Sequence, residues 1–535
     1  MCPQGGREAV TRKDVDLPMG QRIFRDTLRV SVASVAAQAV AFAAGAYIAA
    51  VFGATWQTDV FYLAFALPLF GANVIREAIK AVLVPVLVEV KVKTPDEVHA
   101  VVASALSAVT AIASAVALFF LVSGPWMLPR ATTGLTPEGI RLLGQVLLEL
   151  MPTLPLMCLA GVLSGLLNAY QHFRLPMIVP GVEATVKAVC VLALVRPMGI
   201  HSLALGSVLG ALASLVLLWG WARRCGLTLN FSARLHPSLV KMGRLALFPL
   251  LGNTLLLLNP FVDRTVATRL PPGSITALNY AERINSLPHV LVGAGLFSVV
   301  LSYWSQMVSE EGPGRLGGTL QEGVVTLIYV LTPVAGLLFA FRQPLVRLIL
   351  ERGHFDATAT SLTALALGYL ALGLIPTYVV SLLTRAHLVM QDTRTPVLLG
   401  ILNAGLNLVL DIALVGALAL GGIALSTSLT LTIVAAANLW IIRRRVVAPP
   451  WRALVAPVSY ALAVGLASTV VARLVYSAWQ VTLGSRSLLG LVAGLGVSGS
   501  VGLVAFVGGS MLLGMQEPYR MLGWLRRTAT IEKGA

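Results

Sequence analysis

Apolar runs long enough to cross a membrane recur along almost the whole chain. A helix needs about 20 mostly apolar residues to span the hydrocarbon core of a bilayer. Hydrophobic residues make up 57% of the 535 positions and charged residues only 12%, about half the charge of a soluble domain. This composition excludes a soluble enzyme and a disordered binding protein, and it predicts an all-α polytopic membrane protein with about fourteen transmembrane helices. The predicted helices occupy approximately residues 27–53, 57–90, 98–123, 138–166, 176–196, 201–222, 239–268, 274–308, 318–341, 358–389, 394–416, 421–442, 451–476 and 487–512.

Basic residues gather at the ends of the apolar runs rather than in one patch. The net charge of +16 therefore indicates orientation in a membrane and not a nucleic-acid partner. The first run, residues 30–53, is too long for a signal-peptide core, so we interpret it as a retained span. An even number of spans puts both termini on one side, whose segments hold more than twice as many Lys and Arg residues as the opposite side. The positive-inside rule then predicts that both termini are cytoplasmic.

One constant shift of the chain against itself brings similar residues of its two halves into register. Because the implied unit has six helices, an even number, the two copies should run parallel about an axis along the membrane normal. Two such lobes would enclose a central cavity, where transporters bind substrate. The alternative is that Pro and loop Arg recur through composition alone. The coincident residues are Leu67 and Pro68 with Leu287 and Pro288, Pro176 with Pro396, Ala204 and Leu205 with Ala424 and Leu425, and Arg223 and Arg224 with Arg443 and Arg444.

This repeat predicts five segments. The amino-terminal and carboxy-terminal six-helix lobes are residues 27–225 and 239–445, and two extra helices follow at residues 451–512. Cytoplasmic segments lie at residues 1–26 and 513–535.

Charged side chains within the second predicted helix indicate a functional cavity, because each costs about 2.5–3.5 kcal/mol at the bilayer centre. Asp59 lies near the start of this helix, and Arg76, Glu77 and Lys80 lie in its middle. Arg76 and Lys80 are four residues apart and share a face, and the three middle charges leave one cation uncompensated. We expect Arg76 and Lys80 to line the cavity. Asp59 either acts there or caps the start of its helix.

Two further pairs of charges occur in the fifth and eighth predicted helices. Glu183 and Lys187 are four residues apart and can neutralise each other, which favours a structural pair over a cavity role. Glu282 and Arg283 precede Pro288, and a guanidinium beside a broken helix suits phosphate recognition. Pairing of Arg283 with Glu282, or with a residue of the other lobe, is the alternative.

The uncompensated cation of the second predicted helix, placed in a midplane cavity, predicts an anionic substrate. The candidate substrate-binding residues are Arg283, Arg76 and Lys80. The acidic candidates for the cavity or for coupling to an ion are Asp59, Glu77, Glu282 and Asp411.

The histidines, glycines and cysteines do not occur at the spacings typical of catalytic, phosphate-binding or metal-binding motifs. The seven histidines are scattered over loops and helix ends, and no glycine-rich phosphate loop follows a strand. The cysteines lack C-x-x-C spacing and are interpreted as packing residues. We therefore expect a protein that is not an enzyme, with no catalytic residue, metal site or cofactor. The four cysteines are Cys2, Cys158, Cys190 and Cys225.

Several short strings resemble those of the MurJ/MviN lipid II flippase family, in the multidrug/oligosaccharidyl-lipid/polysaccharide exporter superfamily. Together they extend over about residues 27–445. The strings are Phe52-Gly-Ala, Thr58-Asp-Val-Phe-Tyr, Leu67-Pro68, Asn168-Ala-Tyr-Gln-His-Phe-Arg-Leu-Pro with Pro180, Asp263-Arg264, Arg269-Leu-Pro-Pro-Gly-Ser, Ala277-Leu-Asn-Tyr-Ala-Glu-Arg-Ile, Glu351-Arg-Gly-His-Phe with Thr358 and Thr360, and Gln391-Asp-Thr-Arg-Thr-Pro-Val.

The resemblance implies a multi-pass protein of the bacterial cytoplasmic (inner) membrane whose two lobes alternate between inward-open and outward-open states. Its substrate would be lipid II, the undecaprenyl-pyrophosphate-linked peptidoglycan precursor, and its partners would be membrane lipids and cell-wall synthesis enzymes. Residues 451–512 would then form a groove for the lipid tail. In the family, an essential acidic residue matches Asp59 and an essential arginine matches Arg283.

Four family arginines are missing from the amino-terminal lobe. Two in the first helix fall on Gln38 and Ala44, and a pair in the second falls on Ala72 and Asn73. Arg76 lies about one turn further along the same face and would restore one charge.

Because of these losses, two alternatives stay open. The chain could be an exporter of the same fold for another polyprenyl-linked glycan or amphiphile, or a scaffold that does not transport.

Overall fold

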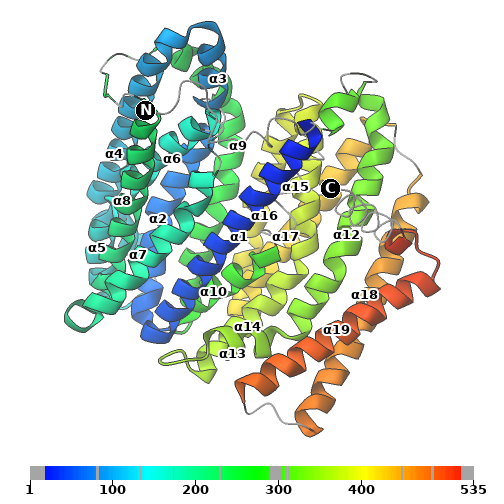
Figure 1. The fold of residues 1–535 in the computed structure, drawn as a ribbon. Helices are drawn as coiled ribbons and strands as arrows, with labels where there is room; N and C mark the ends of the chain where they lie inside the picture. Colours follow the sequence, from blue (N-terminus) through cyan, green and yellow to red (C-terminus); the bar gives the residue numbers. More distant parts are fainter. Residues whose placement is uncertain are drawn as a thin grey trace. The chain divides into compact units, whose positions relative to one another are not determined.

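The structure is a computed structural model (Figure 1). It describes residues 19–519 except residues 80–82, 133, 171, 173, 228, 229, 233, 235, 289–302, 309, 311, 448, 449 and 483–486. Every regular element assigned within these residues is helical. The α-helices are α1 Met19–Phe52, α2 Trp56–Ala78, α3 Val84–Lys93, α4 Val98–Ala131, α5 Pro137–Leu150, α6 Thr153–Ala169, α7 Arg174–Met198, α8 His201–Arg224, α9 Pro237–Ala267, α10 Ser274–Asn285, α12 Leu316–Ala340, α13 Arg342–Leu350, α14 Ala357–Leu372, α15 Leu374–Val389, α16 Arg394–Leu418, α17 Leu420–Arg443, α18 Arg452–Thr482 and α19 Leu488–Leu512.

Membrane-spanning helices dominate the described residues, as the composition predicts. Eleven helices are long and apolar enough to span a bilayer, and α14 with α15, bent by 43°, forms a twelfth. These spans coincide with twelve of the predicted ones. The other two predictions, residues 239–268 and 274–308, fall on α9 and on α10 with residues 289–302, which lie outside the described residues. The total of fourteen therefore stays a prediction.

Two predicted helices are each divided in two. Residues 138–166 form α5 and α6, which break at Met151 and Pro152, where the proline ring interrupts the helical hydrogen bonds. Residues 358–389 break at Gly373. Within the predicted helix 57–90 the structure describes α2 and α3, and residues 80–82 between them lie outside the described residues. A hydropathy profile does not detect such breaks, because the residues on both sides remain apolar.

The chain folds as two compact units. The first comprises Met1–Thr276, His289–Gly295 and Arg352–Phe355, and the second comprises Ala277–Pro288, Leu296–Glu351 and Asp356–Ala535. In the first unit α1 packs on α7, and one apolar core joins α3, α4, α6 and α8. In the second, α16 packs on α17 and α12 packs on α18.

The two units repeat one helix arrangement. Helices α5, α6, α7 and α8 are followed by α14, α15, α16 and α17 at nearly the same offset that places Pro176 on Pro396. The same pairs also pack together: α7 with α8 corresponds to α16 with α17, and α6 with α8 corresponds to α15 with α17. These contacts support the internal repeat independently of the residue coincidences.

Equivalent positions of the repeat also share a helix cap and a turn with positive φ. The side chain of Thr136 accepts a hydrogen bond from the Gly139 amide to cap α5 (3.2 Å), and its equivalent in the repeat, Asp356, caps α14 through the Ala359 amide (2.8 Å). The short connection between α7 and α8 has Gly199 at φ +52°, and the equivalent connection before α17 has Ala419 at φ +49°. Ala419 thus adopts a conformation that favours glycine.

Replacing Ala419 with Gly should stabilise the protein by about 1 kcal/mol, because the strain of a Cβ at positive φ is removed. Equilibrium unfolding in mixed micelles with a denaturing detergent would measure this gain. Gly199→Ala is the matched control and should have the opposite sign. A variant A419G that unfolds as readily as the parent, beside a destabilised G199A, would contradict the repeat-based assignment of strain.

The two last helices pack along α12. Figure 1 shows α18 and α19 side by side, and both contact α12. Small residues allow this close packing: a Cβ added to Gly465 of α18 would lie 2.0 Å from Cγ2 of Thr332, and one added to Gly336 of α12 would lie 2.1 Å from Oγ1 of Thr469. Phe506 of α19 packs against Tyr329 of α12, with ring centroids 4.9 Å apart.

Candidate functional site

Asp59, in the first turn of α2, is buried and binds a backbone segment that is distant in the sequence. Its Oδ2 accepts a hydrogen bond from the Gly273 amide (2.6 Å), and its Oδ1 accepts from the amide (2.7 Å) and hydroxyl (2.6 Å) of Thr276. The cap of α2 itself is Thr55, which forms a capping box with Thr58. Asp59 therefore holds the first turn of α10, where a carboxylate is favoured by exposed amides and by the helix dipole.

The backbone around Asp59 is packed too closely for larger residues. Gly273 has φ +92°, and an added Cβ would lie 2.6 Å from the carbonyl oxygen of Ala54. The hydroxyls of Thr58 and Thr276 are 2.9 Å apart. The glycine is thus required both by its backbone conformation and by the space available.

A third segment, Arg352–Phe355, joins the same end of α1. The His354 amide donates a hydrogen bond to the Ala50 carbonyl (2.8 Å), and a Cβ on Gly353 would lie 2.2 Å from that carbonyl oxygen. Gly53, in turn, approaches the His354 carbonyl so closely that an added Cβ would lie 2.4 Å away.

Three strings that are far apart in the sequence therefore meet within the first unit. They are the residues after α1, the Arg269-Leu-Pro-Pro-Gly-Ser loop and the Arg-Gly-His-Phe loop. All three connections fall on the outer side of the predicted topology. Their meeting agrees with the prediction that they lie on the same side of the membrane, and we call this cluster the Asp59 junction.

Arg76 lies half-buried on α2 and faces two other helices of the first unit. A Cβ added to Gly161 of α6 would be 3.6 Å from Cγ of Arg76. Arg76 and Lys187 both attract the carboxylate of Glu183 on α7. Nζ of Lys187 also lies 4.9 Å from the ring centroid of Phe65 on α2, a cation–π contact. Glu183 is thus shared by two cations and not by Lys187 alone, so these three side chains together carry a net positive charge.

The remaining charged candidates belong to the second and eighth predicted helices. Glu77 is half-buried on α2, and Lys80 lies outside the described residues. Glu282 and Arg283 are half-buried in the last turn of α10 and belong to the second unit, whereas Lys187 and Arg76 belong to the first.

Asp411 on α16 is fully buried among neutral polar side chains. The hydroxyl of Ser426 on α17 donates a short hydrogen bond to Oδ1 of Asp411 and lies 2.8 Å from the Ile423 carbonyl oxygen. Asn407, one turn before Asp411, places Nδ2 3.5 Å from Oγ of Ser426. Asn403, a further turn back, is also buried. Carboxylate, amide and hydroxyl oxygens of this kind are ligands for hard cations or partners for a proton.

The internal repeat relates this polar stripe to the charged cluster of the first unit. The repeat offset places Glu183 on Asn403 and Lys187 on Asn407. Equivalent helices, α7 and α16, thus carry a charged pair in one unit and an amide pair in the other. Sequence reasoning missed both asparagines, although their spacing of four in an apolar helix and the repeat offset together would have indicated them.

A second cluster missed by sequence reasoning surrounds Asp392, in the connection between α15 and α16. Its Oδ2 lies 2.9 Å from Nδ1 of buried His387 and binds Arg445 in a short ion pair. Nε2 of His387 lies 2.9 Å from Oδ1 of Asn438. Partial burial would raise the pKa of Asp392, but hydrogen bonds from Thr395 and the charges of Arg445 and His387 outweigh it and hold the pKa below its ordinary value.

The lowered pKa of Asp392 predicts acid-sensitive stability. Because the folded-state pKa lies below the unfolded value, the stabilisation is complete above about pH 4 and is lost as pH falls through the folded pKa. Asp392→Asn should lower the unfolding free energy at pH 7 by about 1–3 kcal/mol. Unfolding of both proteins from pH 7 to pH 3 should show the difference shrinking at the acid end. A difference that is constant with pH would contradict a charged Asp392.

The comparisons with known proteins agree in the family that they indicate. A family model described as lipid II flippase MurJ matches residues 48–493. Lipid II flippase MurJ of Burkholderia cenocepacia is 26% identical over 391 residues, which cover 71% of this chain and 76% of that protein. The probable lipid II flippase MurJ of Rhizobium tropici is 25% identical over 421 residues, covering 76% and 78%.

Solved structures show the same fold. A lipid II flippase MurJ in an inward closed conformation matches with a TM-score of 0.74 and 20% identity, covering 92% of this chain and 99% of that one. An inward-facing multidrug resistance MATE family transporter of the MOP superfamily matches with a TM-score of 0.63 and 13% identity, covering 78% and 98%. At these identities the likeness concerns the fold alone.

Proposed function

Because the chain belongs to the MurJ family of lipid II flippases, we propose that it moves lipid II from the inner to the outer face of the cytoplasmic membrane by alternating access. The chain is a multi-pass membrane protein of a transporter family and needs no covalent chemistry for this task. Both termini are cytoplasmic in this proposal, because that orientation satisfies the positive-inside rule.

The observation that carries the proposal is the cation surplus around Glu183. Arg76 and Lys187 both attract the one carboxylate of Glu183 among the helices of the first unit, and cations at such a position favour an anionic ligand. The pyrophosphate of lipid II supplies such an anion, and one Arg guanidinium can bind two of its oxygens at once. We assign pyrophosphate binding to Arg76, Lys80 and Arg283, with Lys187 as a further cation.

The two lobes, residues 27–225 and 239–445, move the headgroup while the polyprenyl tail stays in lipid. Helices α18 and α19, in residues 451–512, form the groove along which the tail lies in this proposal. The Asp59 junction closes the outer side, since its three connections all fall there in the predicted topology and are joined by short hydrogen bonds. The flanking segments 1–26 and 513–535 remain in the cytoplasm, and cell-wall synthesis enzymes receive the product.

Asp411 is the proposed coupling residue. It is fully buried, lies beside the hydroxyl of Ser426, and forms a stripe with Asn407 and Asn403. Entry of a cation or proton would neutralise the carboxylate and favour one arrangement of α16 and α17. Glu77 and Glu282, both half-buried, are the remaining acidic candidates.

A second candidate function rests on the missing arginines. Ala72, where the family has an arginine, is completely buried in α2, and Ala44 is buried in α1. Alanine carries no charge at either position, so headgroup recognition there differs from the family pattern. An exporter of another polyprenyl-linked glycan, or a scaffold that does not transport, would share this feature.

Complementation separates these functions. A bacterium depleted of its own lipid II flippase should survive when it expresses this chain, because the remaining cations suffice for pyrophosphate binding. Cell lysis despite normal membrane insertion would reject lipid II as the substrate. Export of another lipid-linked glycan by the same cells would then support the exporter function. Absence of any export would support the scaffold function.

A further inference from the structure

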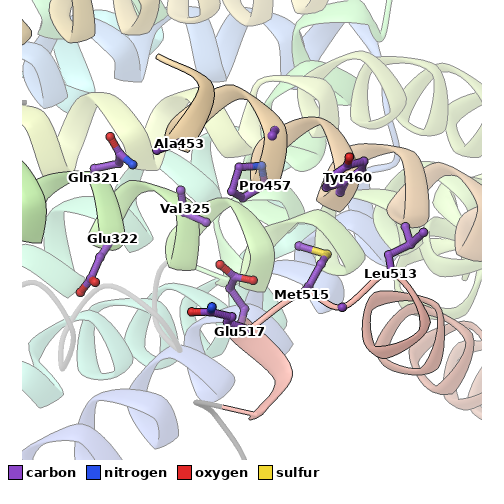
Figure 2. Close-up of a pocket in the computed structure, with 12 residues that line it drawn as sticks. Gln321, Glu322, Val325, Ala453, Pro457, Tyr460, Leu513, Met515 and Glu517 are labelled. Atoms are coloured by element: carbon purple, nitrogen blue, oxygen red, sulfur yellow. The ribbon is translucent and has the colours of Figure 1, made fainter. Parts of the chain in front are cut away.

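A pocket of about 440 Å³ lies at one end of the second unit, apart from every charged candidate considered so far. It is formed by the start of α12, the start of α18 and the residues that follow α19. In Figure 2, Met515 and Glu517 lie across the pocket from Pro457 and Tyr460, and Glu322 and Val325 lie to one side. The volume is typical of a small-molecule site, about 300–1,000 Å³.

The lining combines acidic and neutral hydrogen-bonding groups with apolar ones. Glu322 and Glu517 contribute carboxylates, and Gln321 and Gln516 contribute amides. Two carboxylates in one small pocket stand out in a chain with a net charge of +16. An ammonium group is the complementary ligand, since it donates up to three hydrogen bonds and carries the opposite charge.

One basic residue contacts the lining of the pocket, and a second adjoins a lining residue in the sequence. Nη1 of Arg443 donates a hydrogen bond to Oε1 of Gln321 (3.3 Å), and its guanidinium lies 4.1 Å from the ring centroid of Trp451. Arg452 precedes the lining residue Ala453 at the start of α18. A guanidinium at this edge suits a phosphate diester. The site therefore matches a ligand whose ammonium and phosphate are a short distance apart.

Exposed aromatic and apolar side chains lie at the rim of the pocket. Tyr460 is 50% exposed and Leu513 53% exposed, and the adjacent Leu512 is 90% exposed. The pocket also lies where two spans begin and another ends, at a membrane surface. Aromatic side chains such as Tyr460 are enriched at this level of a bilayer. A ligand with acyl chains can thus place its headgroup in the pocket and its chains against the exposed side chains of Leu512 and Leu513.

We propose that this pocket binds a phospholipid whose headgroup carries a primary ammonium, as in phosphatidylethanolamine. Glu517 and Glu322 hold the ammonium, Arg443 and Arg452 hold the phosphate, and the acyl chains follow the exposed surface beside Leu513. Because α18 and α19 pack on α12, the bound lipid would stabilise the packing of the two extra helices against the repeat. The inference does not depend on which substrate the protein transports.

Native mass spectrometry of the purified full chain tests the proposal with three lipids of equal acyl chains. Phosphatidylethanolamine should bind roughly tenfold more tightly than phosphatidylcholine, whose quaternary amine donates no hydrogen bond, and more tightly than phosphatidylglycerol, which has no amine. The double variant E322Q/E517Q should lose this preference, and E517Q alone should reduce it. Arg452→Gln should weaken phosphatidylethanolamine and phosphatidylcholine alike.

The matched control is Glu89→Gln, which removes an exposed carboxylate that pairs with Lys93 in the first unit. It should leave the preference for phosphatidylethanolamine unchanged. An equal preference in E322Q/E517Q and the parent would overturn the assignment of the ammonium to these carboxylates. Binding of free phosphoethanolamine as tightly as the lipid would overturn the membrane origin of the ligand and indicate a soluble amine instead.

Discussion

Replacement of Arg283 by Ala is expected to abolish lipid II transport while the amount of folded protein in the membrane stays unchanged. Arg283 is half-buried in the last turn of α10, so truncation should leave little of the core disturbed. Loss of one charge-assisted, bidentate contact to pyrophosphate costs about 1.5–3 kcal/mol, or roughly ten- to hundredfold in affinity. Lipid II exposed at the outer face of cells, measured beside membrane protein level, reports both quantities.

Arg283→Lys is the matched control for this prediction. It keeps the positive charge but loses the planar fork that binds two phosphate oxygens, so transport should be reduced and not abolished. Arg76→Ala should be nearly as damaging as Arg283→Ala, because it removes one of the two cations that share Glu183. Normal transport by Arg283→Ala at normal protein level would remove Arg283 from the binding site.

Replacement of Asp59 by Ala is expected to abolish transport and also to destabilise the protein, unlike replacement of Arg283. Three hydrogen bonds from Gly273 and Thr276 end on this buried carboxylate. Their donors would be left without an acceptor, at a cost on the order of 3 kcal/mol or more. Equilibrium unfolding in detergent and transport in cells would separate the two effects.

Two variants refine the test of Asp59. Thr276→Val removes only the hydroxyl donor, so its loss of stability should be about a third of that of Asp59→Ala if the three bonds contribute equally. Asp59→Asn keeps the size of the side chain but sets an amide nitrogen against a backbone amide, so it should also be destabilised. An Asp59→Asn protein with parental stability would show that the junction does not depend on the carboxylate charge.

The spans were predictable because the bilayer imposes one simple requirement. About 20 consecutive apolar residues leave few alternatives to a transmembrane helix, and twelve predicted spans coincide with helices in the described part of the chain. The repeat was also visible, because equivalent turns reuse Pro and Arg at one constant offset. Breaks such as those at Pro152 and Gly373 were not, because the residues on both sides of each break remain apolar.

The candidate site was predictable in part. Charged residues such as Arg76 and Glu183 can be recognised as candidates from the sequence, because a charge within an apolar transmembrane helix costs free energy. Their assembly across α2, α6 and α7 is tertiary, however, and no local spacing encodes it. The same reason hid the partners of Asp59: Gly273 and Thr276 are distant from it in the sequence, and only the short strings shared with the family hinted at their importance.

The departures from the family pattern now have a structural description. Gln38 is exposed on α1, whereas Ala44 and Ala72 are buried, and Asn73 is half-buried. The lost arginines therefore did not leave one open binding surface behind. We expect the substrate headgroup to be held by Arg76, Lys80 and Arg283 in this chain, with Lys187 as a further cation.

Translocation by the purified protein in vesicles tests the central claim most directly. Lipid II with a fluorophore on its pentapeptide would be placed in both leaflets, and a quencher that cannot cross the membrane would be added outside. Vesicles containing this chain should lose nearly all fluorescence, whereas vesicles with the variant R283A should keep the inner-leaflet half, as empty vesicles do. Loss of only the outer half with the folded parent protein would contradict the assignment of lipid II as its substrate.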